Sequence, residues 1–355
     1  MNFCLTEFLK SGAIFSLTSD RLLVGWGKKC RKNAQQLDHT KPVFYINDFF
    51  LTHPSPWIEY SHYLEVSCGA ILETLEENHD YCSQKYPWKT SDFKYFENAF
   101  FELQSSLKEN VLLKAVPYIF SHSDRKMTAS VLMNCLKKAI ECLKENNKFL
   151  YGYWDEKEGV LGLTPEKLFF YSQENPKLIS TMALAGTRNS NSSETEFKMN
   201  EKELKEHHFV IRGIQESLSG LGVVSLGQME VLKLPFIYHL FTPIEIYLHE
   251  NFNFEKILKK LHPTPAVGAL PKKKGEKWLS DFQKHTPRGY YGSPIGIIYP
   301  QYGICSCLVA IRNVQWNEEG MKIGAGAGVI LESALNQEWE EIQLKMESIQ
   351  QQFGL

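Results

Sequence analysis

Apolar runs of strand length follow one another in this chain without helices between them, and this order constrains the fold more than any other feature. Four such runs are separated only by short polar turns: FLYGYW (149–154), GVLGLTP (159–165), KLFFYS (167–172) and KLISTMAL (177–184). Parallel strands need a long crossover between them, whereas antiparallel strands can be joined by tight turns. The pattern therefore predicts an α+β fold with antiparallel sheet rather than a doubly wound parallel fold.

Helical segments flank these strands. Residues 56–150 are predicted to be largely helical, with 130–147 as the clearest amphipathic piece. Further helices are expected over about 195–218, closed by Gly220 and Gly222, and over about 334–350. Between them, three runs predict a second group of strands: YGSPIGIIYP (291–300), YGICSCLVAIRNV (302–314) and MKIGAGAGVI (321–330). No repeat or low-complexity linker divides the sequence, so a single domain over 1–355 is expected.

The charge balance and the lack of long apolar runs exclude several classes of protein. Lys and Arg (39) nearly equal Asp and Glu (41), so the chain lacks the basic surplus of a duplex-coating protein. The basic run PKKKGEK (271–277) is more typical of a solvated turn. No apolar run reaches the roughly 18 residues of a membrane span, and no secretory signal is evident. We expect a soluble, cytoplasmic protein that binds neither nucleic acid nor membrane.

Eight cysteines occur in the sequence, and none of them forms a CxxC pair. No His/Cys cluster has the spacing of a zinc finger either. This distribution favours reduced, mostly buried thiols of an intracellular protein.

The glycine-rich segment GAGAG (324–328) resembles a phosphate-binding loop at first sight. The dinucleotide fingerprint would require a small residue at 329 or 331, where the sequence has Val and Leu. Two interpretations remain: a strand whose glycines allow close packing, or a bare backbone that a small anion can approach. The segment alone favours the first.

Two predicted helices carry acidic residues that could bind a metal ion. Glu338, Glu341 and Lys345 have the i, i+3, i+7 spacing of one helical stripe, and Glu206 and His207 interrupt the apolar pattern of an earlier helix. For either helix alone, the simpler interpretation is that its charged residues form an ordinary solvent-exposed face. Two carboxylates from separate helices, however, suit the oxygen-preferring Mg²⁺.

Three other charged residues stand alone in apolar segments. Lys114 is the only charge in LLKAVPYIF (112–120). Burial would lower its pKa and make it a candidate base, although a lysine that extends its amine to solvent is commoner. Glu166 follows a Thr-Pro pair at a strand junction, where an acid serves as a cap or as a proton donor. Arg312 ends the strand CLVAIR (307–312), as a surface residue or as a carboxylate clamp.

Together these segments resemble the chorismate-utilising enzymes: isochorismate synthases, salicylate synthases, and the large subunits of anthranilate and aminodeoxychorismate synthases. Nine blocks occur in the family's order over residues 110–350: LLKAVPY, LGLTPEKLF, STMALAGTR, KELKEHHFV, FIYHLFTP, LHPTPAVGALP, RGYYGSPIG, CLVAIRN and GAGAGVILESALNQEWEEIQLKM. The resemblance implies a single domain of two large antiparallel sheets, stacked and flanked by helices. Residues 1–100 match no motif and are expected to supply outer strands and helices of that domain.

The resemblance also implies a site. Glu206 and Glu341 would bind Mg²⁺, with Glu338 as a direct or water-mediated ligand, and the metal would hold the ring carboxylate of chorismate. Arg312 and Lys345 would anchor the enolpyruvyl carboxylate of the substrate. The other residues implied to line the pocket are Thr187, His239, Ala266, Gly326, Ala327 and Gly328.

The subclass depends on the nucleophile. The members that use water resemble one another in carrying Lys where the amine-forming members carry Gln, and here Lys114 and HPTPA (262–266) match the water users. The implied reaction is that of an isochorismate synthase: Lys114 deprotonates water, water attacks C2, and Glu166 protonates the departing C4 hydroxyl. An alternative register of this block would put Asn110 in the place of the base.

The sequence is also compatible with three other functions. Salicylate synthase, which adds pyruvate elimination, is the nearest alternative, and an amine-forming synthase component is a further one. A non-catalytic chorismate-binding protein is a third, because Lys284 stands where the family usually has Glu. The product would feed menaquinone or siderophore biosynthesis, and a monomer or weak homodimer is expected.

Overall fold

The computed structural model describes residues 3–77, 86–89, 92–144, 148–190, 193–234 and 237–355. Within this part of the chain, sixteen strands pair into one continuous sheet, and every pairing is antiparallel. These strands are β1 (Gly12–Ser16), β2 (Arg21–Lys32), β3 (Val43–Ile46), β4 (Trp57–Ser67), β6 (Tyr118–Ser123), β7 (Phe149–Trp154), β8 (Gly159–Thr164), β9 (Lys167–Ser172), β10 (Leu178–Asn189), β11 (Gly222–Leu226), β12 (Glu230–Lys233), β13 (Ile237–Leu248), β15 (Pro294–Tyr299), β16 (Ile304–Val309), β17 (Asn313–Asn317) and β18 (Gly320–Gly326). Two short strands, β5 (Lys114–Ala115) and β14 (Ala269–Leu270), form a separate pair.

Helices cover the outer faces of this sheet. They are α1 (Leu5–Lys10), α2 (Cys68–Glu77), α3 (Phe93–Lys108), α4 (Ala129–Lys144), α5 (Glu194–Lys198), α6 (Glu201–Leu218), α7 (Phe254–Leu261), α8 (Lys272–His285) and α9 (Leu335–Phe353). No helix in the described ranges is long and apolar enough to cross a membrane.

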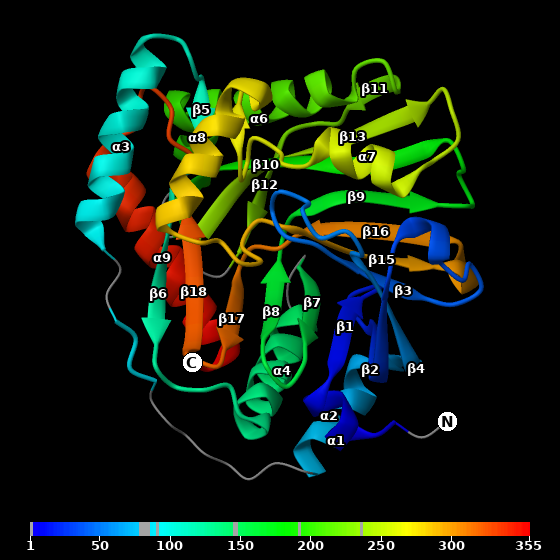
Figure 1. Ribbon diagram of the computed structural model, residues 1–355. Coiled ribbons are helices and arrows are strands. Elements are labelled where there is room, and N and C mark those ends of the chain that lie inside the picture. The colour runs from blue at the N-terminus through cyan, green and yellow to red at the C-terminus, as the bar shows by residue number, and fades with distance from the viewer. Residues whose placement is uncertain (1–2, 78–85, 90–91, 145–147, 191–192, 235–236) are drawn as a thin grey trace.

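The sheet divides into two stacked halves that run in different directions (Figure 1). One half has the order β11-β13-β10-β9-β16-β15-β3, and the other continues as β4-β2-β1-β7-β8-β17-β18-β6. Buried side chains of both halves, including Phe15, Tyr151, Ile297 and Leu308, form one apolar cluster between them. The predicted fold class, with two stacked antiparallel layers flanked by helices, is confirmed, and hydrogen bonds join the two layers into one continuous sheet.

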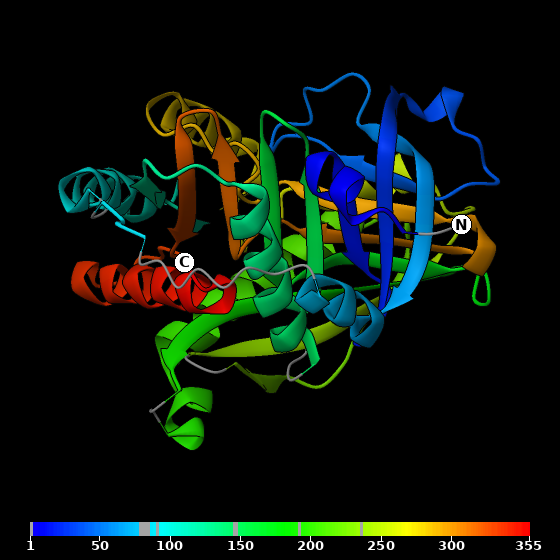
Figure 2. The same ribbon diagram turned by 90° about the horizontal axis from the view of Figure 1, so that it is seen from below.

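Each outer face has its own apolar core. Helices α1, α2, α4 and α9 pack against β1, β2, β7, β8 and β18, and Figure 2 shows α9, α4 and α2 along this face. Helices α6, α7 and α8 pack against the other half of the sheet. The strands of residues 1–67 therefore belong to the same sheet as the rest of the chain.

The first group of predicted strands is confirmed as β7 to β10. The β7–β8 turn shows why it forms: the Asp155 carboxylate accepts the backbone N–H groups of Lys157 (2.8 Å) and Glu158 (3.1 Å). The second group is confirmed as β15 to β18, and the final helix ends at Gly354, whose left-handed backbone (φ 65°) stops it.

Two predictions of helix were wrong in part. Residues 57–67 and 118–123 lie inside the segment predicted to be largely helical, yet they are strands β4 and β6. Their partners β2 and β18 are distant in sequence, so non-local pairing decides their structure. The helix expected over 195–218 is interrupted, because the Asn200 side chain accepts the Glu203 N–H (3.1 Å) and starts α6 anew.

The predicted burial of most cysteines agrees with the residues that the structure describes. Seven cysteines lie in the described ranges, and four of them are buried. Cys82 lies outside the described residues.

Candidate active site

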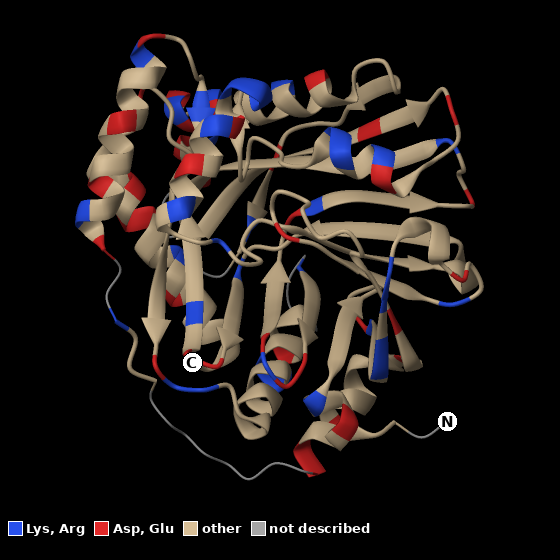
Figure 3. Ribbon diagram, viewed as in Figure 1, with Lys and Arg blue, Asp and Glu red and all other residues tan. Residues whose placement is uncertain are grey.

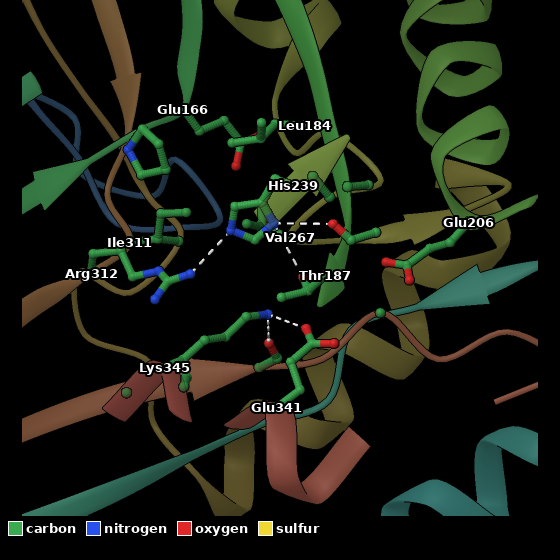
Figure 4. Close-up of a pocket in the computed structure, with 18 of the residues that line it drawn as sticks. Glu166, Leu184, Thr187, Glu206, His239, Val267, Ile311, Arg312, Glu341 and Lys345 are labelled. Carbon is green, nitrogen blue, oxygen red and sulfur yellow. Dashed lines mark hydrogen bonds and ion pairs between the residues drawn. The ribbon is translucent and has the colours of Figure 1, made fainter. Parts of the chain in front are cut away.

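A cavity lies where elements of both halves of the sheet meet, and most of the predicted site residues line it. Helix α6 and strand β10 supply one wall, and β18 and α9 supply the wall opposite (Figure 4). Eleven of the thirteen predicted residues line the cavity: Lys114, Glu166, Thr187, Glu206, His239, Ala266, Arg312, Gly326, Gly328, Glu341 and Lys345.

The two predicted residues that do not line it are Ala327 and Glu338. The Ala327 side chain is buried in the core under α9, and its N–H donates to the Pro117 carbonyl (3.2 Å). Because neighbouring residues of an extended chain face opposite ways, Gly326 and Gly328 face the cavity and Ala327 does not. The Glu338 carboxylate lies behind the cavity wall and pairs with Lys202.

Lys114 is 1% exposed and lies on β5, opposite Leu270 of β14. Its Nζ donates to the Pro265 carbonyl (2.8 Å) and lies 3.3 Å from Glu206 Oε1. Burial lowers the pKa of Lys114, although Glu206 acts in the opposite direction. Asn110 is exposed in the turn before β5, so the geometry favours the register that uses Lys114.

Glu166 follows β8 and is also buried. The Thr164 hydroxyl accepts the Glu166 N–H (3.1 Å), and the Thr264 hydroxyl donates to Glu166 Oε1 (3.3 Å). Burial raises the pKa of Glu166 to about 7, against the opposing influence of Thr264, Lys114 and Lys345. The carboxyl group can therefore hold a proton close to neutral pH.

A buried chain of hydrogen bonds orients Arg312. Its Nη2 lies 3.2 Å from His239 Nε2, and because a guanidinium can only donate, Nε2 must be the accepting nitrogen. The His239 proton is then on Nδ1, which faces the Gly186 carbonyl (3.1 Å) and the Thr187 hydroxyl (3.2 Å). Burial together with Arg312 holds the pKa of His239 well below its usual range, so the ring is neutral.

Arg312 is the cation best placed to receive an anion. It forms no ion pair with any carboxylate in the described ranges, and its backbone has a left-handed φ of 55°, which is uncommon outside glycine. Burial lowers its pKa to about 10, so the guanidinium stays charged. A buried cation without a counter-ion among the protein groups is unfavourable and favours binding of an anionic ligand.

Lys345 and Glu341 project from α9 into the cavity. Lys345 Nζ donates to the Gly326 carbonyl (2.8 Å) and pairs with Glu341. A Cβ at position 328 would lie 2.0 Å from Glu206 Oε1, so glycine there lets the Glu206 carboxylate reach the strand. The segment ends strand β18, as the first interpretation of the glycine run predicts. Gly326 and Gly328 also line the cavity, and the approach of an anion to their backbone stays a prediction.

The acidic residues form a cluster around a lysine rather than an open metal site. Lys202 Nζ lies 2.9 Å from Glu338 Oε1, 3.1 Å from Glu206 Oε2 and 3.6 Å from Glu203 Oε1. No three His, Cys, Asp or Glu side chains among the described residues are grouped so that they could hold a metal ion. Burial raises the pKa values of Glu203 and Glu338, while Lys202 opposes this change.

The donor set nevertheless fits a hard divalent cation. Glu206 and Glu341 reach the cavity from separate helices, and Glu338 Oε2 is buried with no hydrogen-bond partner. Carboxylate oxygens are the ligands that Mg²⁺ prefers, and it usually completes its shell with water and substrate oxygens.

Several residues of the site were missed from the sequence. Leu184, Tyr291 and Ile311 line the cavity, and each lies in a segment already recognised without an assigned role. Lys202 precedes Glu206 by four residues, and this spacing on a helix could have revealed their contact.

The unusual Lys284 lies away from the cavity. It is exposed on α8 and pairs with Asp281 (2.7 Å). The basic run 271–277 is the start of this helix rather than a turn, and Lys272 donates to the carbonyls of Lys259 (3.2 Å) and Lys260 (3.1 Å) at the end of α7. Lysines, arginines and acidic residues are mixed along the outer helices (Figure 3).

The chain is similar to known proteins both in sequence and in fold. The chain matches the family described as "Chorismate binding enzyme" over residues 78–354. It is 31% identical over 216 residues to isochorismate synthase MenF of Haemophilus influenzae, covering 58% of this chain and 49% of that protein. The match therefore spans about half the length of that relative. It is 26% identical over 350 residues to isochorismate synthase MenF of Bacillus subtilis, covering 89% and 71%.

The fold resembles a solved structure at low sequence identity. MenF, the menaquinone-specific isochorismate synthase from Escherichia coli, superposes with a TM-score of 0.77 at 17% identity, covering 99% of this chain and 91% of that chain.

Proposed function

This chain belongs to the family of chorismate-binding enzymes, and from that premise we propose that it is an isochorismate synthase. The observation that carries the proposal is the presence of Lys114 and Glu166 in one cavity, where burial opposes the charged form of each. A neutral amine can accept a proton and a protonated carboxyl can donate one. These are the two proton transfers that moving a hydroxyl group from C4 to C2 of chorismate requires.

Each protein group has a defined task in this reaction. Arg312 and Lys345 bind the enolpyruvyl carboxylate, and the neutral His239 keeps the guanidinium in place. Lys114 takes a proton from water as its oxygen bonds to C2. The ring double bonds shift, the C4–O bond breaks, and Glu166 protonates the leaving hydroxyl. One water enters and one leaves, so the overall reaction is an isomerisation.

A divalent metal has a place in this proposal. Glu206 and Glu341 would hold Mg²⁺, with Glu338 as a nearby third carboxylate. When bound, the ion would neutralise the ring carboxylate of chorismate, which would otherwise face Glu206 and Glu341 directly. The product would feed menaquinone or siderophore biosynthesis.

The decisive experiment is to incubate the purified protein with chorismate and Mg²⁺ and to identify the product by chromatography. Isochorismate is expected, and the Glu166→Gln variant should form little of it. Salicylate plus pyruvate would instead indicate a salicylate synthase. Formation of an aminated product with ammonia, or recovery of unchanged chorismate, would contradict the proposal.

A further inference from the structure

Lys202 occupies the centre of the acidic cluster, and the reaction described above gives it no task. Its ammonium contacts Glu206 from its own helix and Glu338 from α9. One lysine thus bridges the two helices that carry the proposed metal ligands. Glu203 contributes a third carboxylate at 3.6 Å.

The position of Lys202 in its helix does not explain why the side chain points inward. It is in the first turn of α6, two residues after the Asn200 cap, where the helix dipole disfavours a cation. Its side chain is 16% exposed, while those of its partners Glu206 and Glu338 are 7% and 2% exposed. The buried carboxylates therefore hold the ammonium in the cluster, and the chain of Lys202 still reaches solvent.

The carboxylate oxygens that contact Lys202 belong to the same residues that are proposed to bind the metal ion. Glu206 is a proposed metal ligand, yet its Oε2 faces Lys202 and its Oε1 faces Lys114. Glu338 Oε1 also faces Lys202, while Oε2 is buried without a partner. Two cations held by the same carboxylates would repel each other at short range, where the effective dielectric is low. A divalent ion and the Lys202 ammonium are therefore alternatives in this cluster.

We propose that Lys202 is an internal counter-ion that neutralises the carboxylate cluster in the metal-free protein and competes with Mg²⁺ for Glu206 and Glu338. This inference rests on the proposed function, because it takes these carboxylates as metal ligands. When the metal binds, the ammonium leaves the cluster along its exposed side. Mg²⁺ alone would consequently bind weakly, because it would have to displace the ammonium from Glu206 and Glu338.

The competition predicts a measurable gain in metal affinity when the ammonium is removed. Where only a minor conformation of a protein can bind a ligand, the apparent dissociation constant equals the intrinsic constant divided by the fraction of molecules in that conformation. If the ammonium leaves the cluster in one molecule in ten, Lys202→Met should bind Mg²⁺ about tenfold more tightly than the original protein. Without metal, the same variant should have a lower melting temperature, because its carboxylates lose their counter-ion.

The test is calorimetric titration of MgCl₂ into the chelator-treated protein of residues 1–355 without chorismate, combined with melting curves with and without Mg²⁺. Lys205→Met is the matched control, since Lys205 lies one turn along α6 and makes an exposed ion pair with Glu332. Its Mg²⁺ affinity should equal that of the original protein. Lys202→Gln serves as a second variant in case the methionine side chain prevents folding.

The outcomes separate this inference from the proposed function. Tighter Mg²⁺ binding in the Lys202 variants alone supports the competition. Equal or weaker binding in them, with normal binding in the original protein, would overturn the competition and leave the metal assignment intact. Absence of Mg²⁺ binding in the original protein and in both variants would overturn the metal site and the competition together.

Discussion

The Gly328→Ala substitution should lower enzymatic turnover much more than it lowers the stability of the fold. A Cβ added at this position would lie 2.0 Å from Glu206 Oε1 and 2.6 Å from Lys114 Cε. The backbone there has no left-handed φ, so alanine adds only its methyl group. An ordinary contact would require the Glu206 oxygen to move by more than about 1 Å.

This displacement should affect activity much more than stability. The atoms that must move are ends of side chains, so the overpacking should cost about 1–3 kcal/mol of unfolding free energy. They are also the proposed base and a proposed metal ligand, and a misplacement of about 1 Å can cost about 10²-fold in rate. We therefore expect a folded protein with turnover reduced by about two orders of magnitude.

The assay is chromatographic quantification of chorismate conversion, with a thermal melt of the same preparation. Gly69→Ala is the control, because a Cβ there would meet only Ser67 Oγ, at 3.9 Å, on helix α2. That variant should keep the original turnover. If Gly328→Ala turned over chorismate at the original rate, then Glu206 and Lys114 would not be held against this strand during the reaction.

Four further outcomes are expected. Lys114→Gln should lower turnover by about 10²–10⁴-fold while chorismate still binds, as measured by calorimetry, because only the general base is lost. Turnover should fall as the pH rises through about 7, since burial raises the pKa of the proton donor Glu166 to about 7 and the donor is lost above it; a rate profile from pH 5 to 9 checks this. EDTA should abolish activity and Mg²⁺ restore it, while Glu341→Gln should remain inactive at ordinary Mg²⁺ concentrations. Arg312→Lys should raise KM about 10–100-fold, because a point charge replaces a forked donor worth about 1.5–3 kcal/mol.

The sequence predicted those elements whose structure depends on neighbouring residues. Strand β7 pairs with β8, and β9 pairs with β10, so each pair is joined by a short local connection. The turn of the β7–β8 hairpin is fixed by a single side chain, Asp155. Strand β6 was missed because its structure depends on pairing with β18, about 200 residues later in the chain. No local pattern within 118–123 distinguishes a strand paired in this way from a buried helical segment.

Among the site residues, too, some can be predicted from the local sequence and others depend on long-range contacts. Lys114 was noticed because it is a lone charge in an apolar segment, and the apolar composition of a segment is a local property of the sequence. The conformation of Lys202 depends instead on carboxylates from two helices, one of which begins 133 residues later. The family resemblance implied Glu338 as a direct or water-mediated ligand, but neither the resemblance nor the helical spacing says whether a neighbouring lysine already holds this carboxylate.

The location of the cavity explains how so many charged groups can be buried together. It lies between two apolar cores, one under α4 and α9 and the other under α6 and α7. These cores stabilise the elements that carry Glu166, Glu206, Arg312 and Lys345, so the site itself need not contribute stability. The charges are balanced only in part: Arg312 has no carboxylate partner within the described ranges, and Glu338 keeps an unpaired oxygen. Because chorismate brings two carboxylates and Mg²⁺ brings two positive charges, binding both should complete pairings that the protein groups alone leave open.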